Sequence, residues 1–150
     1  MIRGLVYVSK EEISFYAESL KELAARAASR NAELSVTGYL YYSEGRFLQY
    51  LEGESQTVEG LFSRIAADPR HDVVTSLCED TVSDRRFPTW HMRWLNAGST
   101  KHIELEGVLS DHLVFLQTLK EISPTNHSWH PRVWSMIDKL AETQQRLGLL

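Results

Sequence analysis

The sequence lacks several features that mark particular classes of protein. Cys78 is the only cysteine in 150 residues, which excludes intramolecular disulfides and clusters of thiolate metal ligands. The net charge of −4 argues mildly against nucleic acid as a partner, because phosphate binding usually needs a basic surface. No apolar run approaches the roughly 20 residues of a membrane-spanning helix, and the N-terminus lacks the apolar core of a signal peptide. We therefore expect a cytoplasmic protein that binds neither nucleic acid nor membrane.

Motifs of the common catalytic and metal sites are also missing. The chain has no HExxH segment, no glycine-rich phosphate loop and no hydrolase triad order. Glu52 and Glu54 are expected to be solvated, which argues against a paired-carboxylate site. His127 and His130 have the spacing of two metal ligands, but no third ligand is near and Pro131 follows them. The sequence thus predicts neither an enzyme nor a metal protein.

The composition is that of a folded domain. Apolar residues make up 43% of the chain and charged residues 24%, as in ordinary globular proteins, and 150 residues can bury a core. All predicted strands fall within residues 1–95. We expect one domain there, followed by a helical extension over residues 96–150.

The most informative stretch is a predicted β-hairpin over residues 36–53. Aromatic and branched side chains fill both strands, and residues 43–46 have the composition of a turn. Gln49 shares the apolar face of the second strand with Phe47 and Leu51, because side chains alternate along a strand. A buried amide without partners costs about 1–3 kcal/mol. Gln49 therefore needs a partner, either another side chain or a ligand.

The pattern of apolar residues predicts the other elements. Strands are expected over residues 2–9, 73–78 and 87–95, and helices over residues 10–31, 55–68, 108–122 and from 131 onward. Ser9 and Glu12 fit a capping box at the start of the first helix, with Ser14 as a competing cap. The order βαββαββ predicts a ferredoxin-like α+β sandwich, with two helices on one face of a mixed five-stranded sheet. After a linker over residues 96–101, the last two helices are expected to cover the other face.

Small residues gather near the end of the first predicted helix, where Ala24 and Ala27 share one face. One interpretation is high helix propensity together with close packing of the helix against the sheet. The other is that these alanines leave a slot in which a flat ligand lies against Ala24 and Ala27. The sequence leaves both interpretations open.

Together these segments resemble the BLUF domain, a family of blue-light sensors that use flavin. The resemblance covers about residues 1–95 and rests on LVYVS, SRNAELSVTG, FLQYLEG, DPRH and RRFPTWHMRW, which occur in the family's order. Residues 96–150 resemble, more loosely, the two-helix cap of the short stand-alone members.

The resemblance implies roles for the residues closest to the flavin. Tyr7 would donate an electron and a proton to the excited flavin, and Gln49 would lie between this tyrosine and the ring. Asn31 would hydrogen-bond the carbonyl edge of the ring. Trp90 and Met92 match a pair whose exchange is proposed as an output step. Both are expected on one face of the last strand, where a slip by two residues would exchange them.

Further polar positions match the family at the pyrimidine end of the ring. Arg64 and Asp68, expected one helical turn apart on the second helix, are two of these. His71 matches a histidine near the ring, and Arg70 beside it could reach a phosphate. Ala27 stands where some members have a serine, four residues before the asparagine, which would remove one hydrogen bond to the ring.

Taken singly, these residues have ordinary explanations. Tyr7 could be a core tyrosine, and Arg64 with Asp68 a surface pair worth about 0.3–0.5 kcal/mol. Because these residues all match the family together and in order, they favour a photoreceptor that binds FAD or FMN without covalent attachment. A rearranged Gln49 amide would then bond the ring carbonyl, shift absorption to the red and signal to a protein partner or a homo-oligomer interface.

Two alternatives remain at this point. One is a light-insensitive ferredoxin-like module that binds a ligand or a partner. A flavin enzyme is disfavoured, because the sequence supplies no acid, base or thiol on a substrate side.

Overall fold

The structure is a computed structural model that describes residues 2–13, 17–96, 103–122 and 130–147. Its elements, in chain order, are β1 (Ile2–Glu11), α1 (Ala17–Glu33), β2 (Thr37–Ser43), β3 (Arg46–Glu54), α2 (Ser55–Ala66), β4 (His71–Val82), β5 (Arg93–Asn96), α3 (Ile103–Ile122) and α4 (His130–Arg146). The strands form one five-stranded sheet in the order β4-β1-β3-β2-β5. Neighbouring strands are antiparallel except β2 and β5, which are parallel. The predicted mixed sheet and ferredoxin-like order are confirmed.

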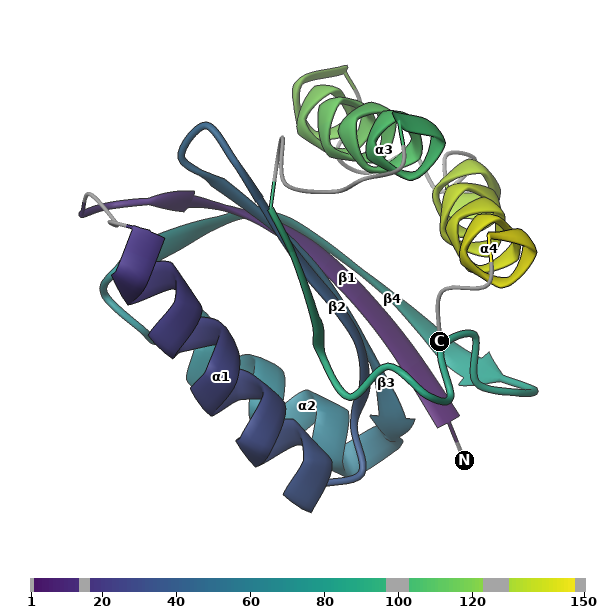
Figure 1. Cartoon of the computed structure of the whole chain (residues 1–150), viewed down its shortest axis with the longest axis horizontal. Helices are drawn as coiled ribbons and strands as arrows, with labels where there is room; N and C mark the ends of the chain where they lie inside the picture. The colour runs from purple at the N-terminus through teal and green to yellow at the C-terminus, as the bar shows by residue number, and fades with distance from the viewer. Residues whose placement is uncertain (1, 14–16, 97–102, 123–129, 148–150) are drawn as a thin grey trace.

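Helices cover both faces of the sheet. In Figure 1, α1 and α2 lie on one face and α3 and α4 on the other. β1 and β2 both run antiparallel to β3, so they are parallel to each other, and α1 provides the crossover that such a pair requires. The prediction of a two-helix cap on the second face is confirmed.

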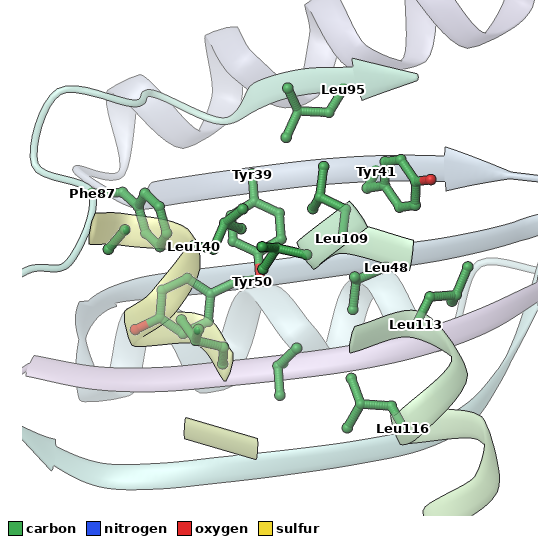
Figure 2. Packing of buried hydrophobic residues seen from close by; sticks show 14 of the residues in the cluster. Tyr39, Tyr41, Leu48, Tyr50, Phe87, Leu95, Leu109, Leu113, Leu116 and Leu140 are labelled. Carbon is green, nitrogen blue, oxygen red and sulfur yellow. The ribbon is translucent and has the colours of Figure 1, made fainter. Parts of the chain in front are cut away.

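Side chains that alternate along the strands divide the apolar residues into two cores. The core beneath α3 and α4, which we call the cap core, includes the residues labelled in Figure 2: Tyr39, Tyr41, Leu48, Tyr50, Phe87, Leu95, Leu109, Leu113, Leu116 and Leu140. The α1/α2 core on the other face includes Leu5, Tyr7, Leu40, Phe47, Leu51, Val58, Leu61 and Met92. Each pair of helices therefore buries its apolar side against its own face of the sheet.

The first strand is longer than predicted. β1 continues through Glu11, paired with β3 on one side and with β4 on the other. Ser9 is fully buried within this strand, so the prediction that Ser9 caps the first helix is wrong. Pairing along both edges satisfies the backbone polar groups, and this outweighs the local capping signal. The competing cap, Ser14, lies outside the described residues.

The last strand is shorter than predicted. β5 has only four residues, where a strand over residues 87–95 was expected. The N–H of Trp90 donates to the carbonyl of Phe87 at 3.3 Å, closing a turn with Pro88 at the second position, which prolines favour. Met92 has a φ of 60°, a left-handed conformation that does not occur within a regular strand. The prediction that Trp90 and Met92 share one face of a strand is therefore wrong.

The boundaries of the other elements differ less from the predicted ones. β4 extends beyond the predicted residues 73–78 because it pairs along the length of β1, and α3 begins earlier than the predicted residue 108. Residues 97–101 of the predicted linker lie outside the described residues, as does His127. In the part of the chain that the structure describes, no helix is long and apolar enough to cross a membrane, and no group of three or more potential ligands could hold a metal ion.

Candidate ligand site

A partly open cavity with an internal volume of about 100 Å³ lies between the sheet and the pair α1 and α2. Its lining residues are Tyr7, Leu23, Ala27, Arg30, Leu40, Phe47, Gln49, Arg64, Ile65, Asp68, Arg70 and His71. One part of this lining is apolar and aromatic, and another part is charged. The cavity thus brings together most of the predicted site residues from β1, α1, β3 and the α2–β4 region.

Gln49 is the central polar residue of this site. It lies directly opposite Tyr7 in the β1–β3 pairing and is only 2% exposed. The Tyr7 hydroxyl donates to Gln49 Oε1, and Gln49 Nε2 donates to Met92 Sδ at 3.1 Å. The predicted burial of Gln49 is confirmed, and both ends of its amide have side-chain partners.

Tyr7 is held as a neutral hydrogen-bond donor. Burial raises the pKa of its hydroxyl, the nearby Arg30 lowers the pKa, and Asp68 raises it, with a net shift upward. The ring packs 5.5 Å from the ring of Phe62 and 6.2 Å from that of His71, measured between centroids. Because the hydroxyl keeps its proton, it fixes Gln49 Oε1 as the acceptor.

Asn31 is completely buried, and it carries an unpaired donor. Its Oδ1 accepts from Arg30 Nε at 3.4 Å, whereas its Nδ2 has no hydrogen-bond partner among the described residues. A buried unpaired donor costs about 1–3 kcal/mol. Asn31 does not itself line the cavity, but the adjacent Arg30 does. An acceptor on a ligand would satisfy Nδ2.

The alanines of α1 differ in their relation to the cavity. Ala24 and Ala27 are both 6% exposed, but only Ala27 lines the cavity. Close helix packing therefore accounts for Ala24, while Ala27 leaves space beside the sheet. A contact between Ala24 and a ligand stays a prediction.

The charged part of the lining is formed by Arg30, Arg64, Asp68 and Arg70. α2 ends at Ala66, so the prediction that Asp68 lies on this helix is wrong; Pro69 does not permit the helix to continue. Arg70 donates to both oxygens of Asp68, with Nη2 and Oδ2 2.6 Å apart. This hydrogen bonding lowers the pKa of Asp68 to about 2. The remaining arginines leave a net positive rim.

His71 is fixed by two hydrogen bonds on the cavity wall. Its Nε2 donates to the carbonyl of Ile65 at 2.6 Å, so in the neutral ring Nδ1 accepts from the Ser9 hydroxyl at 2.7 Å. Ser9, expected as a helix cap, thus orients a site residue. Its alternation with Tyr7 along β1 was the signal that could have placed Ser9 on this face.

Trp90 and Met92 lie on opposite faces of the sheet. Met92, 3% exposed, belongs to the α1/α2 core beside Gln49. Trp90, 2% exposed, belongs to the cap core, where its ring stacks on Phe87 at 5.2 Å. The left-handed turn at Met92 separates the two side chains in this way.

Glu52 is not solvated as expected, but fully buried. Its carboxylate accepts from the backbone N–H groups of Arg86 and Phe87 at 2.9 and 2.7 Å and from the hydroxyls of Thr37 and Tyr50. Four donors replace water around the charge, which is how a carboxylate becomes tolerable inside a protein. Glu54, in contrast, is exposed as predicted.

Arg30 was not among the predicted site residues. It lines the cavity and directly precedes the predicted Asn31 in the sequence. Burial lowers the pKa of Arg30, as does the neighbouring Arg64. Its position beside Asn31 was the only sequence signal that could have indicated it.

Comparisons with known proteins agree with the geometry. The family model described as "Sensors of blue-light using FAD" matches residues 2–93. A photoactivated adenylate cyclase subunit beta of Euglena longa is 32% identical over 151 residues, which cover 98% of this chain and 16% of that relative. The chain therefore spans only a small part of this relative's length.

Solved structures extend the comparison to the fold. A bacterial light-regulated adenylyl cyclase superposes with a TM-score of 0.69 at 27% identity, over 93% of this chain and 40% of that chain. The dark-state structure of BlrB, a BLUF protein, gives a TM-score of 0.66 at 24% identity, over 95% of this chain and 96% of that chain. The second likeness extends over both helices of the cap and supports the fold.

Proposed function

The chain belongs to the BLUF family, the sensors of blue light using FAD, and from this premise we propose that it is a blue-light photoreceptor. Residues 1–95 would form the photosensory domain and residues 96–150 a cap that carries the output. FAD would be held non-covalently in the cavity between the sheet and the pair α1 and α2, with FMN as a possible substitute.

The residues in and beside the cavity support flavin binding. The apolar lining and Ala27 suit a flat ring, and the unpaired Nδ2 of Asn31 suits a carbonyl oxygen. The arginine rim suits phosphate, which planar guanidinium groups bind well. Arg70, together with Arg30, would serve the phosphate end, whereas Arg64 would lie at the pyrimidine end of the ring. Bound flavin supplies absorption of blue light and, once excited, accepts an electron.

The single observation that carries the proposal is the buried hydrogen-bonded row Tyr7–Gln49–Met92. Tyr7 holds a proton that it can release and recover, and Gln49 has an acceptor on one side of its amide and donors on the other. The bond from Gln49 to the Met92 thioether is the weak one, because sulfur is a poor acceptor. Losing it therefore costs little when the amide rotates or tautomerises.

We further propose that the signal is read by a protein partner or by an interface between copies of the chain. We propose a sensory role without turnover chemistry for these residues, because the family model that matches residues 2–93 describes sensors of blue light. The name "photoactivated adenylate cyclase subunit beta" describes the Euglena longa relative as a whole. A cytoplasmic location remains a prediction.

The test is the absorption spectrum of the flavin-loaded protein before and after blue light. We expect a reversible red shift in the wild type and its loss in Gln49→Leu, because leucine offers neither donor nor acceptor. The matched control is Gln56→Leu, which makes the same change at an exposed position on α2 and should keep the shift.

Two results would contradict the proposal. Protein that stays colourless after incubation with flavin would favour the light-insensitive binding module. A shift of wild-type size in Gln49→Leu would show that this amide is not part of the light response.

A further inference from the structure

Arg86 lies where the segment between β4 and β5 meets α4. Its side chain is 12% exposed and donates to Asp138 Oδ1 on α4 at 2.6 Å, to Glu79 Oε2 on β4 at 2.9 Å and to the hydroxyl of Tyr50 on β3 at 2.9 Å. The guanidinium carbon also lies 5.6 Å from the ring centre of Trp134 on α4. One side chain thus contacts two strands and a cap helix.

The backbone at Arg86 is fixed to the strand that carries Gln49. Both its N–H and that of Phe87 donate to the buried carboxylate of Glu52, which lies three residues after Gln49 on β3. Because Glu52 is fully buried, this connection is shielded from water. The light-sensing strand and the start of the segment therefore form one unit.

The other end of the segment is Met92, which accepts from Gln49. Between these ends the chain is compact: the Phe87 and Trp90 rings stack, and the N–H of Met92 donates to the carbonyl of Trp90 at 2.8 Å. Met92 also has a left-handed backbone conformation that is unfavourable for a side chain of its size. A displacement of Met92 would therefore move the whole segment, because its internal contacts hold it together.

We propose that Arg86 is a positioning residue for signal output. It couples the position of the segment between β4 and β5, which ends at Met92, to Asp138 and Trp134 on α4. The inference rests on the proposed function, because it assumes that light alters the bond between Gln49 and Met92. A light signal can bias α4 only if the contacts of α4 differ between the two states. Arg86 provides contacts that can differ.

Asp138 is the best position for a test. Its side chain is 55% exposed, so Asp138→Asn removes the charge without leaving a buried unpaired group. Asp138→Glu retains the charge and serves as the conservative variant. Glu142→Gln removes a charge from an exposed position one turn further along α4 and serves as the matched control.

The experiment measures hydrogen–deuterium exchange of the α4 amides in the dark and under continuous blue light, on the full chain loaded with FAD. In the wild type and Glu142→Gln we expect light to change exchange by about fivefold, the low end of ordinary coupling between sites. Asp138→Asn should keep the red shift but lose most of the α4 response, and Asp138→Glu should recover part of it.

The outcomes separate this inference from the proposed function. A red shift in the wild type without any change in α4 would overturn the role of Arg86 alone, as would an undiminished α4 response in Asp138→Asn. Absence of the red shift in the wild type would overturn the proposed function and this inference together.

Discussion

Asn31 and Gln49 are both buried amides, but they differ in the pairing of their polar atoms. Gln49 donates to Met92 and accepts from Tyr7, whereas Asn31 retains an unpaired Nδ2. Proteins rarely leave a buried donor unpaired. Under the proposed function, Gln49 is the residue that would change partners within the chain, and Asn31 is the residue whose unpaired donor would bind the flavin.

Asn31→Ala should therefore weaken flavin binding. Removing a hydrogen bond of about 1–2 kcal/mol lowers the affinity by about 5- to 30-fold. Titration of flavin, followed by quenching of its fluorescence, measures this affinity. Ser29→Ala changes an exposed residue on the same helix and should bind normally; equal affinities in the two variants would count against a flavin contact at Asn31.

Sequence reasoning at the residue scale was strongest for Tyr7 and Gln49. Gln49 could be placed on an apolar face because it alternates with Phe47 and Leu51, whereas the role of Tyr7 came from the resemblance to the family. Sequence reasoning failed for Glu52, because a carboxylate at a strand end is ordinarily exposed. Two of the donors that hold Glu52, the N–H groups of Arg86 and Phe87, come from 34 and 35 positions later in the chain, and no local pattern indicates them.

β2 and α2 each contain a glycine, and the two positions have opposite requirements. Gly38 on β2 has a φ of 143°, and a Cβ there would lie 1.9 Å from the carbonyl oxygen of Tyr50. Gly60 on α2 is exposed, and a Cβ there would meet nothing within 4 Å. The N–H of Gly38 donates to the carbonyl of Trp90 at 2.9 Å.

Alanine at these two positions should change stability in opposite directions. Gly38→Ala combines backbone strain with a clash against backbone, so we expect a loss of about 3 kcal/mol or more. Gly60→Ala improves helix propensity and should gain about 0.5–1 kcal/mol. Urea unfolding followed by circular dichroism measures both. A stable Gly38→Ala protein would be inconsistent with the close contact of β2 and β3.

Elements whose apolar pattern was regular were predicted well, and elements that depend on distant pairing were not. α3 and α4 followed from their apolar spacing. β5 was predicted too long, because its aromatic residues favour strands while the turn closed by Phe87 and Trp90 divides them. β1 was predicted too short, because its extension depends on pairing with β4.

At the scale of the whole molecule, the cap side of the sheet buries a histidine whose ring has no hydrogen-bond partner among the described residues. His112 on α3 is fully buried, and neither ring nitrogen has a partner among the described residues. Burial lowers its pKa from 6.5 to about 4. As the pH falls below 6.5, the unfolded chain takes up a proton that the folded chain does not, so stability is lost until about pH 4 and the loss then levels off.

His112→Leu should remove this dependence. Between pH 7 and pH 4.5 the wild type should lose about 2–3 kcal/mol more than the variant, at 1.36 kcal/mol per pKa unit. Urea unfolding at a series of pH values provides the comparison. His91→Asn alters an exposed histidine and should follow the wild type; an identical pH dependence in His112→Leu would mean that His112 is solvated.

The sequence by itself determined the order of the elements, the division into two apolar faces and the burial of Gln49 on the face that also carries Tyr7. These properties follow from local periodicity and from motifs in a matching order. Only the tertiary structure decided that Met92, not Trp90, pairs with Gln49, that Glu52 is buried, and that the segment after β4 contacts α4. Each of these depends on a backbone turn or a distant donor, and such contacts are set by packing between elements rather than by the pattern within any one of them.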